Sequence, residues 1–131
     1  MIVVDASVLA NVVADDGTDG TTARAAVRGQ DLVAPELVDV ETVAVLRKRW
    51  LSGDLDDGRF HAAVTDLVDL AITRHPMSAL MLRAYELRAN VTPYDAVYVG
   101  LAEALRCPLL TSDQRLANAT GPRCEIRLLS T

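Results

Sequence analysis

The stretch Ile2-Val3-Val4-Asp5-Ala6-Ser7-Val8-Leu9 opens the chain and indicates how it folds. Its first three residues are β-branched and form a short apolar run, which is typical of a buried strand. Asp5-Ala6-Ser7 ends this run, and apolar residues then recur at helical spacing as far as Val13. A strand that passes through a short polar turn into a helix is the first half of a βαβ unit.

The same alternation continues along the chain. Four more strands are predicted, at residues 32–34, 70–73, 109–111 and 125–129. Helices are predicted between them, at residues 21–28, 36–51, 54–68, 78–88, 93–106 and, briefly, from Gln114. We expect residues 15–20 to break the first helix and Pro76 to end the third strand. Strands that alternate with helices predict right-handed crossovers in a parallel sheet, so the fold class is α/β.

The composition limits the size and class of the protein. A chain of 131 residues has the size of one domain, residues 1–131, and buries a single core. Half of the residues are apolar and 4% are aromatic, so the core is built mainly from Val, Leu and Ala. No apolar run has the roughly 18 residues of a membrane span, and no cleavage signal is evident at the N-terminus. We therefore expect a cytoplasmic protein that does not cross a membrane.

The charged residues and the cysteines exclude several classes of site. A net charge of −5 opposes general binding to nucleic acid, so any contact with RNA must be local. The basic triplet at residues 47–49 is interpreted as the solvated end of a helix. Cys107 and Cys124 stand outside any CxxC spacing, which argues against a zinc site or a disulfide framework.

Two aspartates follow predicted strands, where open α/β sheets bind their ligands. Asp5 follows the first strand and Asp113 follows the fourth. Each also has an ordinary explanation, because an aspartate between a strand and a helix is a favoured N-cap. Taken singly, the capping interpretation is the stronger one for both.

Two further carboxylates lie on predicted helices. Asp95 completes the capping-box spacing that begins at Thr92, and it stands three residues before Tyr98 in the buried stripe of its helix. Its carboxylate therefore caps the helix or faces a cleft. Glu41 has only apolar neighbours at i±3 and i±4, so we expect it to have a partner, either an arginine or a metal ion shared with other acids.

Four acids in one cleft would repel one another unless a cation compensated their charge. Ligands that offer only oxygen favour Mg²⁺ or Mn²⁺ over zinc, and Mg²⁺ takes one or two carboxylates directly. Such an ion orients and deprotonates a water and neutralises charge on a phosphodiester. The chemistry indicated is metal-assisted phosphodiester hydrolysis.

Four segments together resemble a PIN domain, and more narrowly a VapC toxin. They are the opening stretch to Leu9, Pro35-Glu36-Leu37 leading to Glu41, Thr92-Pro93-Tyr94-Asp95-Ala96, and Leu110-Thr111-Ser112-Asp113. They occur in the family's order, from Met1 almost to the end of the chain. The resemblance implies a three-layer α/β/α fold around a mostly parallel sheet of four to five strands.

The resemblance also implies a function and a set of site residues. The expected function is that of a Mg²⁺-dependent endoribonuclease toxin that cleaves structured transfer or ribosomal RNA and is silenced by a VapB antitoxin. Asp5, Glu41, Asp95 and Asp113 match the family's catalytic acids, and Asp5 and Asp95 match its metal ligands. Ser7 and Thr111 match hydroxyl residues that steady these acids, although turn hydrogen bonding explains them equally well. Gln114 and Asn118 are neutral where some relatives carry a further carboxylate, so a permanently bound second ion is not implied.

The family further implies protein partners. A homodimer is expected, with the apolar helix at residues 78–88 as a candidate interface. The run at residues 43–46 is apolar on more than one helical face, so it can also present a groove to an amphipathic antitoxin segment. Such a segment can place a basic side chain among the four acids. The alternative is that both faces are buried in the core or in the dimer.

Other classes fit less well. A phosphate-accepting receiver domain needs a lysine after a late strand, and the only lysine, Lys48, lies in a predicted helix. A haloacid-dehalogenase-type phosphatase needs a second Asp two residues after the first, where this chain has Ser7. His61 and His75 lie in no nucleophile context, which sets Ser-His-Asp catalysis aside. The remaining alternative is a PIN-like interaction module that has lost catalysis, and Mg²⁺ binding with RNA cleavage would discriminate the two.

Overall fold

The central sheet has five strands, all of them parallel. The computed structural model of the chain describes residues 1–129 and gives the strands as β1 Ile2–Val4, β2 Leu32–Pro35, β3 Ile72–His75, β4 Leu109–Thr111 and β5 Ile126–Leu128. Their order in the sheet is β3-β2-β1-β4-β5, and every neighbouring pair runs in the same direction. The predicted α/β class and number of strands are therefore confirmed.

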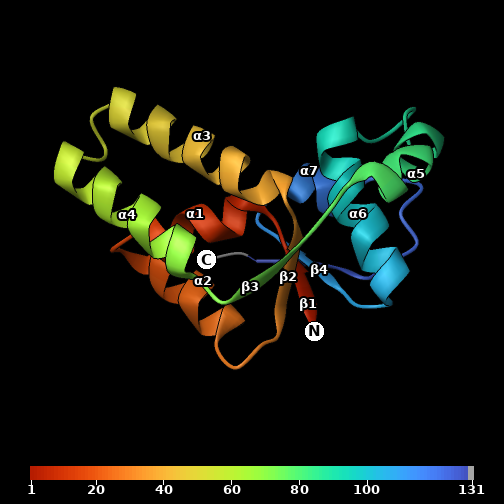
Figure 1. Cartoon of the computed structure of the whole chain (residues 1–131), viewed down its shortest axis with the longest axis horizontal. Helices are drawn as coiled ribbons and strands as arrows, with labels where there is room; N and C mark the ends of the chain where they lie inside the picture. The colour runs from red at the N-terminus through yellow and green to blue at the C-terminus, as the bar shows by residue number, and fades with distance from the viewer. Residues whose placement is uncertain (130–131) are drawn as a thin grey trace.

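Helices cover both faces of this sheet. The helical elements are α1 Ala6–Ala14, α2 Thr18–Val27, α3 Leu37–Leu51, α4 Asp57–Asp69, the 3-10 turn η1 Ser78–Leu80, α5 Met81–Glu86, α6 Pro93–Leu105 and α7 Gln114–Ala117. Figure 1 shows α1 to α4 on one side of the sheet and α5 and α6 on the other. This division follows from right-handed crossovers, because the chain moves outward from β1 to β3 and then returns to β4 on the other side of β1.

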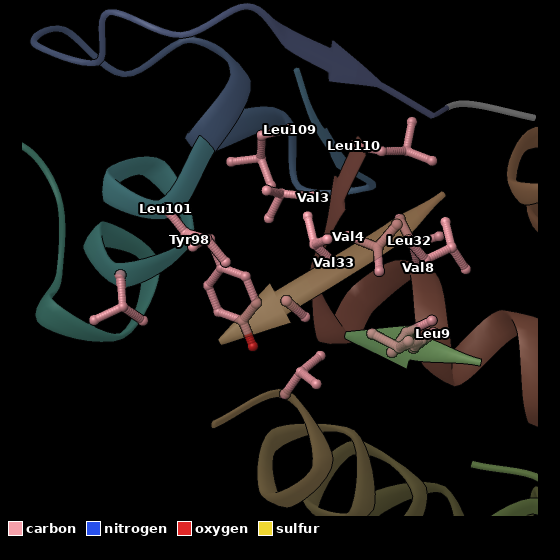
Figure 2. Close-up of a cluster of buried hydrophobic side chains, with 14 of the residues drawn as sticks. Val3, Val4, Val8, Leu9, Leu32, Val33, Tyr98, Leu101, Leu109 and Leu110 are labelled. Carbon is pink, nitrogen blue, oxygen red and sulfur yellow. The ribbon is translucent and has the colours of Figure 1, made fainter. Parts of the chain in front are cut away.

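The core lies where β1 and α6 meet. Val3 and Val4 are fully buried, and every residue of α6 from 96 to 102 is buried as well. Tyr98 is the largest fully buried side chain, and Figure 2 shows its ring beside the sheet among the aliphatic side chains. Of the predicted stripe, Tyr98, Leu101 and Ala102 are buried and Leu105 is partly buried, so the middle of α6 is fixed against the sheet.

The third strand and the helix predicted after it differ from the structure. The third strand begins at Ile72 instead of residue 70, because Leu70 still caps α4 by donating its N–H to the carbonyl of Leu67. It extends to His75, whose carbonyl accepts a hydrogen bond from the N–H of Glu36 at 2.9 Å. The single helix predicted over residues 78–88 is wrong, since the chain forms the short turn η1 followed by only six residues of α5.

The turn between α1 and α2 is tighter than predicted. We expected residues 15–20 to break the helix, but α2 already begins at Thr18. The carboxylate of Asp15 accepts hydrogen bonds from the N–H groups of Gly17 and Gly20, at 2.8 and 2.9 Å. A Cβ atom at Gly20 would lie 1.7 Å from the carbonyl oxygen of Asp15, so only glycine permits this close approach.

Candidate active site

The candidate site lies at the point where the order of strands reverses. β1 and β4 are neighbours in the sheet, and the chain leaves their carboxyl ends for opposite sides, which is where open α/β sheets bind ligands. Asp5 follows β1 directly, and Asp113 follows β4 after one intervening residue. These two carboxylates line a cleft of about 290 Å³ together with Glu41 of α3 and Asp95 of α6. The structure therefore brings all four predicted acids to one cleft.

Asp5 caps α1 and also faces the cleft. Its Oδ1 accepts hydrogen bonds from the Ser7 hydroxyl at 2.6 Å and from the N–H of Val8 at 3.2 Å, and its Oδ2 accepts one from the Thr111 hydroxyl. The side chain is buried, with 6% of the residue exposed. Burial raises the pKa of Asp5, although these hydrogen bonds oppose the shift. The expected N-cap is confirmed, and the same bonds fix the orientation of a carboxylate in the cleft.

Ser7 and Thr111 also connect the Asp5 turn to the end of β4. The Ser7 hydroxyl accepts a hydrogen bond from the N–H of Ser112 at 2.9 Å, and the Thr111 hydroxyl accepts one from the N–H of Asp113 at 3.0 Å. Each hydroxyl thus donates to Asp5 and accepts from the loop that carries Asp113. The two hydroxyl residues therefore link the carboxyl end of β1 to the carboxyl end of β4.

Asp113 caps the short helix α7. Its Oδ1 accepts hydrogen bonds from the N–H groups of Arg115 and Leu116, at 2.9 and 3.4 Å. The capping interpretation is thus confirmed for this residue as well. Because capping engages only Oδ1 in these bonds, Oδ2 can serve the cleft, where it lies 3.7 Å from Nη2 of Arg115.

Asp95 stands in the first turn of α6. Thr92 is the N-cap of this helix, and its hydroxyl accepts a hydrogen bond from the N–H of Asp95 at 3.2 Å. The Asp95 carboxylate faces the cleft, where burial and the nearby charge of Asp113 raise its pKa. Of the two alternatives for the carboxylate, the structure supports the cleft, because only the N–H of Asp95 takes part in the cap and, within residues 1–129, no backbone N–H donates to its side chain.

Glu41 is held by a tyrosine. The Tyr98 hydroxyl donates a hydrogen bond to Oε1 of Glu41 at 2.5 Å, from α6 across to α3. Burial raises the pKa of Glu41, the bond from Tyr98 opposes the shift, and the charges of Asp95 and Asp5 raise it further. Within residues 1–129, Glu41 has no ion pair, so the predicted alternative of an arginine partner is wrong.

The donor set suits a hard cation. Asp5, Glu41 and Asp95 all have raised pKa values, and across the described range none of them pairs with a basic side chain. In that same range no three acidic, His or Cys side chains converge closely enough to surround an ion. The cleft offers carboxylate oxygens, which are the ligands that Mg²⁺ takes one or two at a time, and neither a Cys nor a His lines it.

A second cavity is larger but carries different chemistry. It has a volume of about 690 Å³ and lies beside α1, α3 and α4, lined by several aspartates with Arg49 and Arg59. It holds one ion pair, in which Arg59 contacts both carboxylate oxygens of Asp16 at 3.0 Å, and Arg49 donates to the neutral side chain of Asn11 at 2.7 Å. The carboxylates of Asp15 and Asp56 accept hydrogen bonds from backbone N–H groups at the starts of α2 and α4. The smaller cavity is distinguished by its position at the carboxyl ends of β1 and β4, where acids from four segments of the chain meet.

Sequence reasoning missed two residues of the cleft. Tyr98 was predicted only as part of a buried stripe, and Lys48 only as part of a solvated helix end. A buried tyrosine needs a hydrogen-bond partner for its hydroxyl, so the burial predicted for Tyr98 could have indicated a polar contact. Lys48 is seven residues after Glu41 and therefore lies on the same face of α3, a spacing that could have placed it beside the cleft.

Comparison with known proteins identifies the family of the chain. The family model of the PIN domain matches residues 2–122. Ribonuclease VapC1 of Mycobacterium tuberculosis is 40% identical over 128 residues, which cover 97% of this chain and 96% of that protein. Ribonuclease VapC9 of the same species is 39% identical over 129 residues, 98% of each chain.

A solved structure supports the fold. The crystal structure of Mycobacterium tuberculosis VapC20, described as a Sarcin-Ricin loop cleaving toxin, aligns with a TM-score of 0.70 over 89% of this chain and 93% of that one. At 16% identity this likeness supports the fold alone. The chain belongs to the PIN-domain family. Its full-length relatives place it among the VapC toxins of that family.

Proposed function

We propose that this chain is a Mg²⁺-dependent endoribonuclease toxin that cleaves structured transfer or ribosomal RNA and so inhibits translation. The observation that carries the proposal is the cleft in which Asp5, Glu41, Asp95 and Asp113 meet, three of them without a basic partner in the described part of the chain. Full-length relatives named ribonucleases support the same reaction. Mn²⁺ is expected to substitute for Mg²⁺, because it prefers the same oxygen ligands.

Asp5 and Asp95 are the residues proposed to hold the ion. When bound, the ion would supply a polarised water and neutralise charge on the phosphodiester. Ser7 and Thr111 orient Asp5, so the carboxylate does not need to reorganise when the ion arrives. Burial raises the pKa of Glu41, which makes it a stronger proton acceptor than an ordinary carboxylate, and Tyr98 holds its carboxylate toward the cleft.

A VapB-type antitoxin is the proposed regulator. Ala44 and Val45 line the cleft beside Glu41, so an amphipathic segment can rest on them and place a basic side chain among the acids. Mixing the chain with the product of the gene immediately upstream should give a complex that no longer cleaves RNA. Binding that leaves cleavage unchanged would contradict this regulation while leaving the nuclease proposal intact.

We also propose that the protein acts in the cytoplasm as a homodimer. Within residues 1–129, no helix combines the length and the apolar character needed to cross a membrane. The segment proposed for the dimer exposes Met81, Leu82 and Tyr85, with 46%, 82% and 62% of each residue accessible. Its apolar side chains would be covered by a second copy.

The activity is tested by incubating the purified chain with total RNA in Mg²⁺ or in EDTA and sequencing new 5′ ends. The proposal expects ends at one or a few positions in Mg²⁺ and none in EDTA. New ends in both conditions would contradict a metal-dependent reaction. No new ends in either condition would favour a catalytically inactive PIN-like interaction module.

A further inference from the structure

Lys48 is the only lysine of the chain, and it lines the acid cleft. It lies seven residues after Glu41 on α3, two helical turns or about 10 Å along the axis. Between them Ala44 and Val45 line the same wall. A positive charge therefore stands at one end of the wall that has Glu41 at the other.

Arg115 stands beyond the opposite side of the cleft. It lines a small cavity of about 90 Å³ together with Asp95, and Asp95 lines the acid cleft as well. The Arg115 side chain is 83% exposed and lies 3.7 Å from Asp113, a weak surface interaction that leaves most of its donors available. Figure 1 shows α3 on one side of the edge of the sheet and α7 with the first turn of α6 on the other.

The acids between these two cations create a difficulty for the substrate. An RNA strand carries a negative charge at every phosphate, and the chain as a whole has a net charge of −5. A metal ion compensates charge at the reacting phosphate but not at the phosphates on either side. Compensating the charge of those flanking phosphates requires cations close to the cleft, and Lys48 and Arg115 meet this requirement.

We propose that Lys48 and Arg115 bind backbone phosphates on the two sides of the reacting phosphodiester, so that the RNA strand crosses the cleft from α3 to α7. The inference rests on the proposed function and adds the path of the substrate to it. Because both side chains bind phosphate, they position the strand without reading its sequence. The ordinary alternative is that both side chains are solvated surface charges.

The inference is tested by RNA binding in a background that cannot cleave. A fluorescein-labelled RNA hairpin with a single-stranded loop of mixed sequence is titrated with Asp5→Asn protein in Mg²⁺, and fluorescence anisotropy is followed over a series of salt concentrations. Lys48→Gln and Arg115→Gln are each added to this background. Arg47→Gln is the matched control, because it removes one positive charge from an exposed neighbour about 100° around α3.

Each test variant should weaken binding by roughly threefold to tenfold near physiological salt. The slope of log affinity against log salt should become shallower by about 0.7 for each phosphate of a single strand that is no longer neutralised. Arg47→Gln should leave both quantities close to those of the background. Equal losses of affinity for the test variants and the control would overturn the inference.

The parallel cleavage assay separates this inference from the proposed function. If the unaltered chain cleaves the same RNA in Mg²⁺ while the two variants bind like the control, only the strand path is wrong. If the unaltered chain neither binds nor cleaves this RNA or total RNA, the proposed function and the strand path both fail.

Discussion

Replacing Tyr98 by Phe removes one hydroxyl from the core and nothing else. The ring is buried with 1% of the residue exposed, so Phe fills the same space. The hydrogen bond that disappears is the one that Tyr98 donates to Oε1 of Glu41 at 2.5 Å. Glu41 is half-buried in the cleft beside Asp5 and Asp95, so its carboxylate is left among like charges without a donor.

The loss of stability in Tyr98→Phe depends on the charge of the acceptor, the Glu41 carboxylate. A hydrogen bond to a charged group contributes about 1.5–3 kcal/mol to the free energy of unfolding. Glu41 keeps some access to water, so we expect the lower part of this range, about 1.5–2 kcal/mol. For a domain of this size that loss lowers the melting temperature by roughly 6 °C. At low pH the Glu41 carboxyl is neutral in both proteins, and the loss should fall toward the roughly 1 kcal/mol of a neutral bond.

Urea unfolding of the metal-free protein measures this directly, near pH 7 and again near pH 4, within the ordinary range of carboxyl pKa values. Tyr85→Phe is the control, because Tyr85 is 62% exposed and its hydroxyl has no hydrogen bond among residues 1–129. A Glu41→Gln background should shrink the effect of Tyr98→Phe, since the acceptor is then neutral. The reasoning is refuted if Tyr98→Phe costs the same at both pH values, or no more than Tyr85→Phe.

Four other perturbations have expected results that calorimetry or urea unfolding can check. Glu41→Gln should raise the free energy of unfolding near pH 7 and abolish cleavage. The gain in stability should vanish as the pH falls, because a raised pKa means that only the ionised form of Glu41 destabilises the fold. A loss of stability would show a structural role. Glu103→Gln should lower the free energy of unfolding by about 2 kcal/mol near pH 7, and the loss should shrink in acid. Burial alone would raise the pKa of Glu103, but hydrogen bonds from Arg83 and from the N–H of Arg123 lower it, so the ionised form stabilises the fold. Thr42→Val should stabilise the protein by about 1 kcal/mol, because the Thr42 hydroxyl is buried and finds no hydrogen-bond partner among residues 1–129. A destabilised variant would show that the hydroxyl is bonded in solution. Mg²⁺ at 100 times its dissociation constant should add about 2.7 kcal/mol to the unaltered protein and nothing to Asp5→Asn, and equal gains would place the ion elsewhere.

The sheet and the positions of its acids were predictable because local signals agreed with the global fold. The β-branched run before Asp5 and the apolar run before Asp113 each specify a strand, and parallel strands bring their carboxyl ends to one edge. Capping a helix and lining the cleft are compatible roles for Asp5 and for Asp113. One carboxylate oxygen caps the helix and the side chain still faces the cleft.

The missed features depend on interactions between distant segments. Nothing near Glu41 in the sequence shows that Tyr98, 57 residues later, donates to it. The start of β3 depends on where α4 ends, which is set by tertiary packing and not by the apolar run at residues 70–73. The early start of α2 depends on the Asp15 carboxylate and on the close approach of the Asp15 carbonyl oxygen to Gly20. The composition of the turn, rich in Asp and Gly, does not indicate these contacts.

The most direct test of the central claim is the rate of RNA cleavage by Asp5→Asn and Asp95→Asn protein at saturating Mg²⁺. Asp31→Asn is the control, since Asp31 is an exposed aspartate outside the cleft. An amide keeps the shape of the carboxylate and removes its charge, so each cleft variant should remain folded and lose cleavage by about 100-fold or more. The control should cleave at the rate of the unaltered chain. A folded Asp5→Asn or Asp95→Asn protein that cleaves RNA at that rate would contradict the assignment of this cleft as the active site.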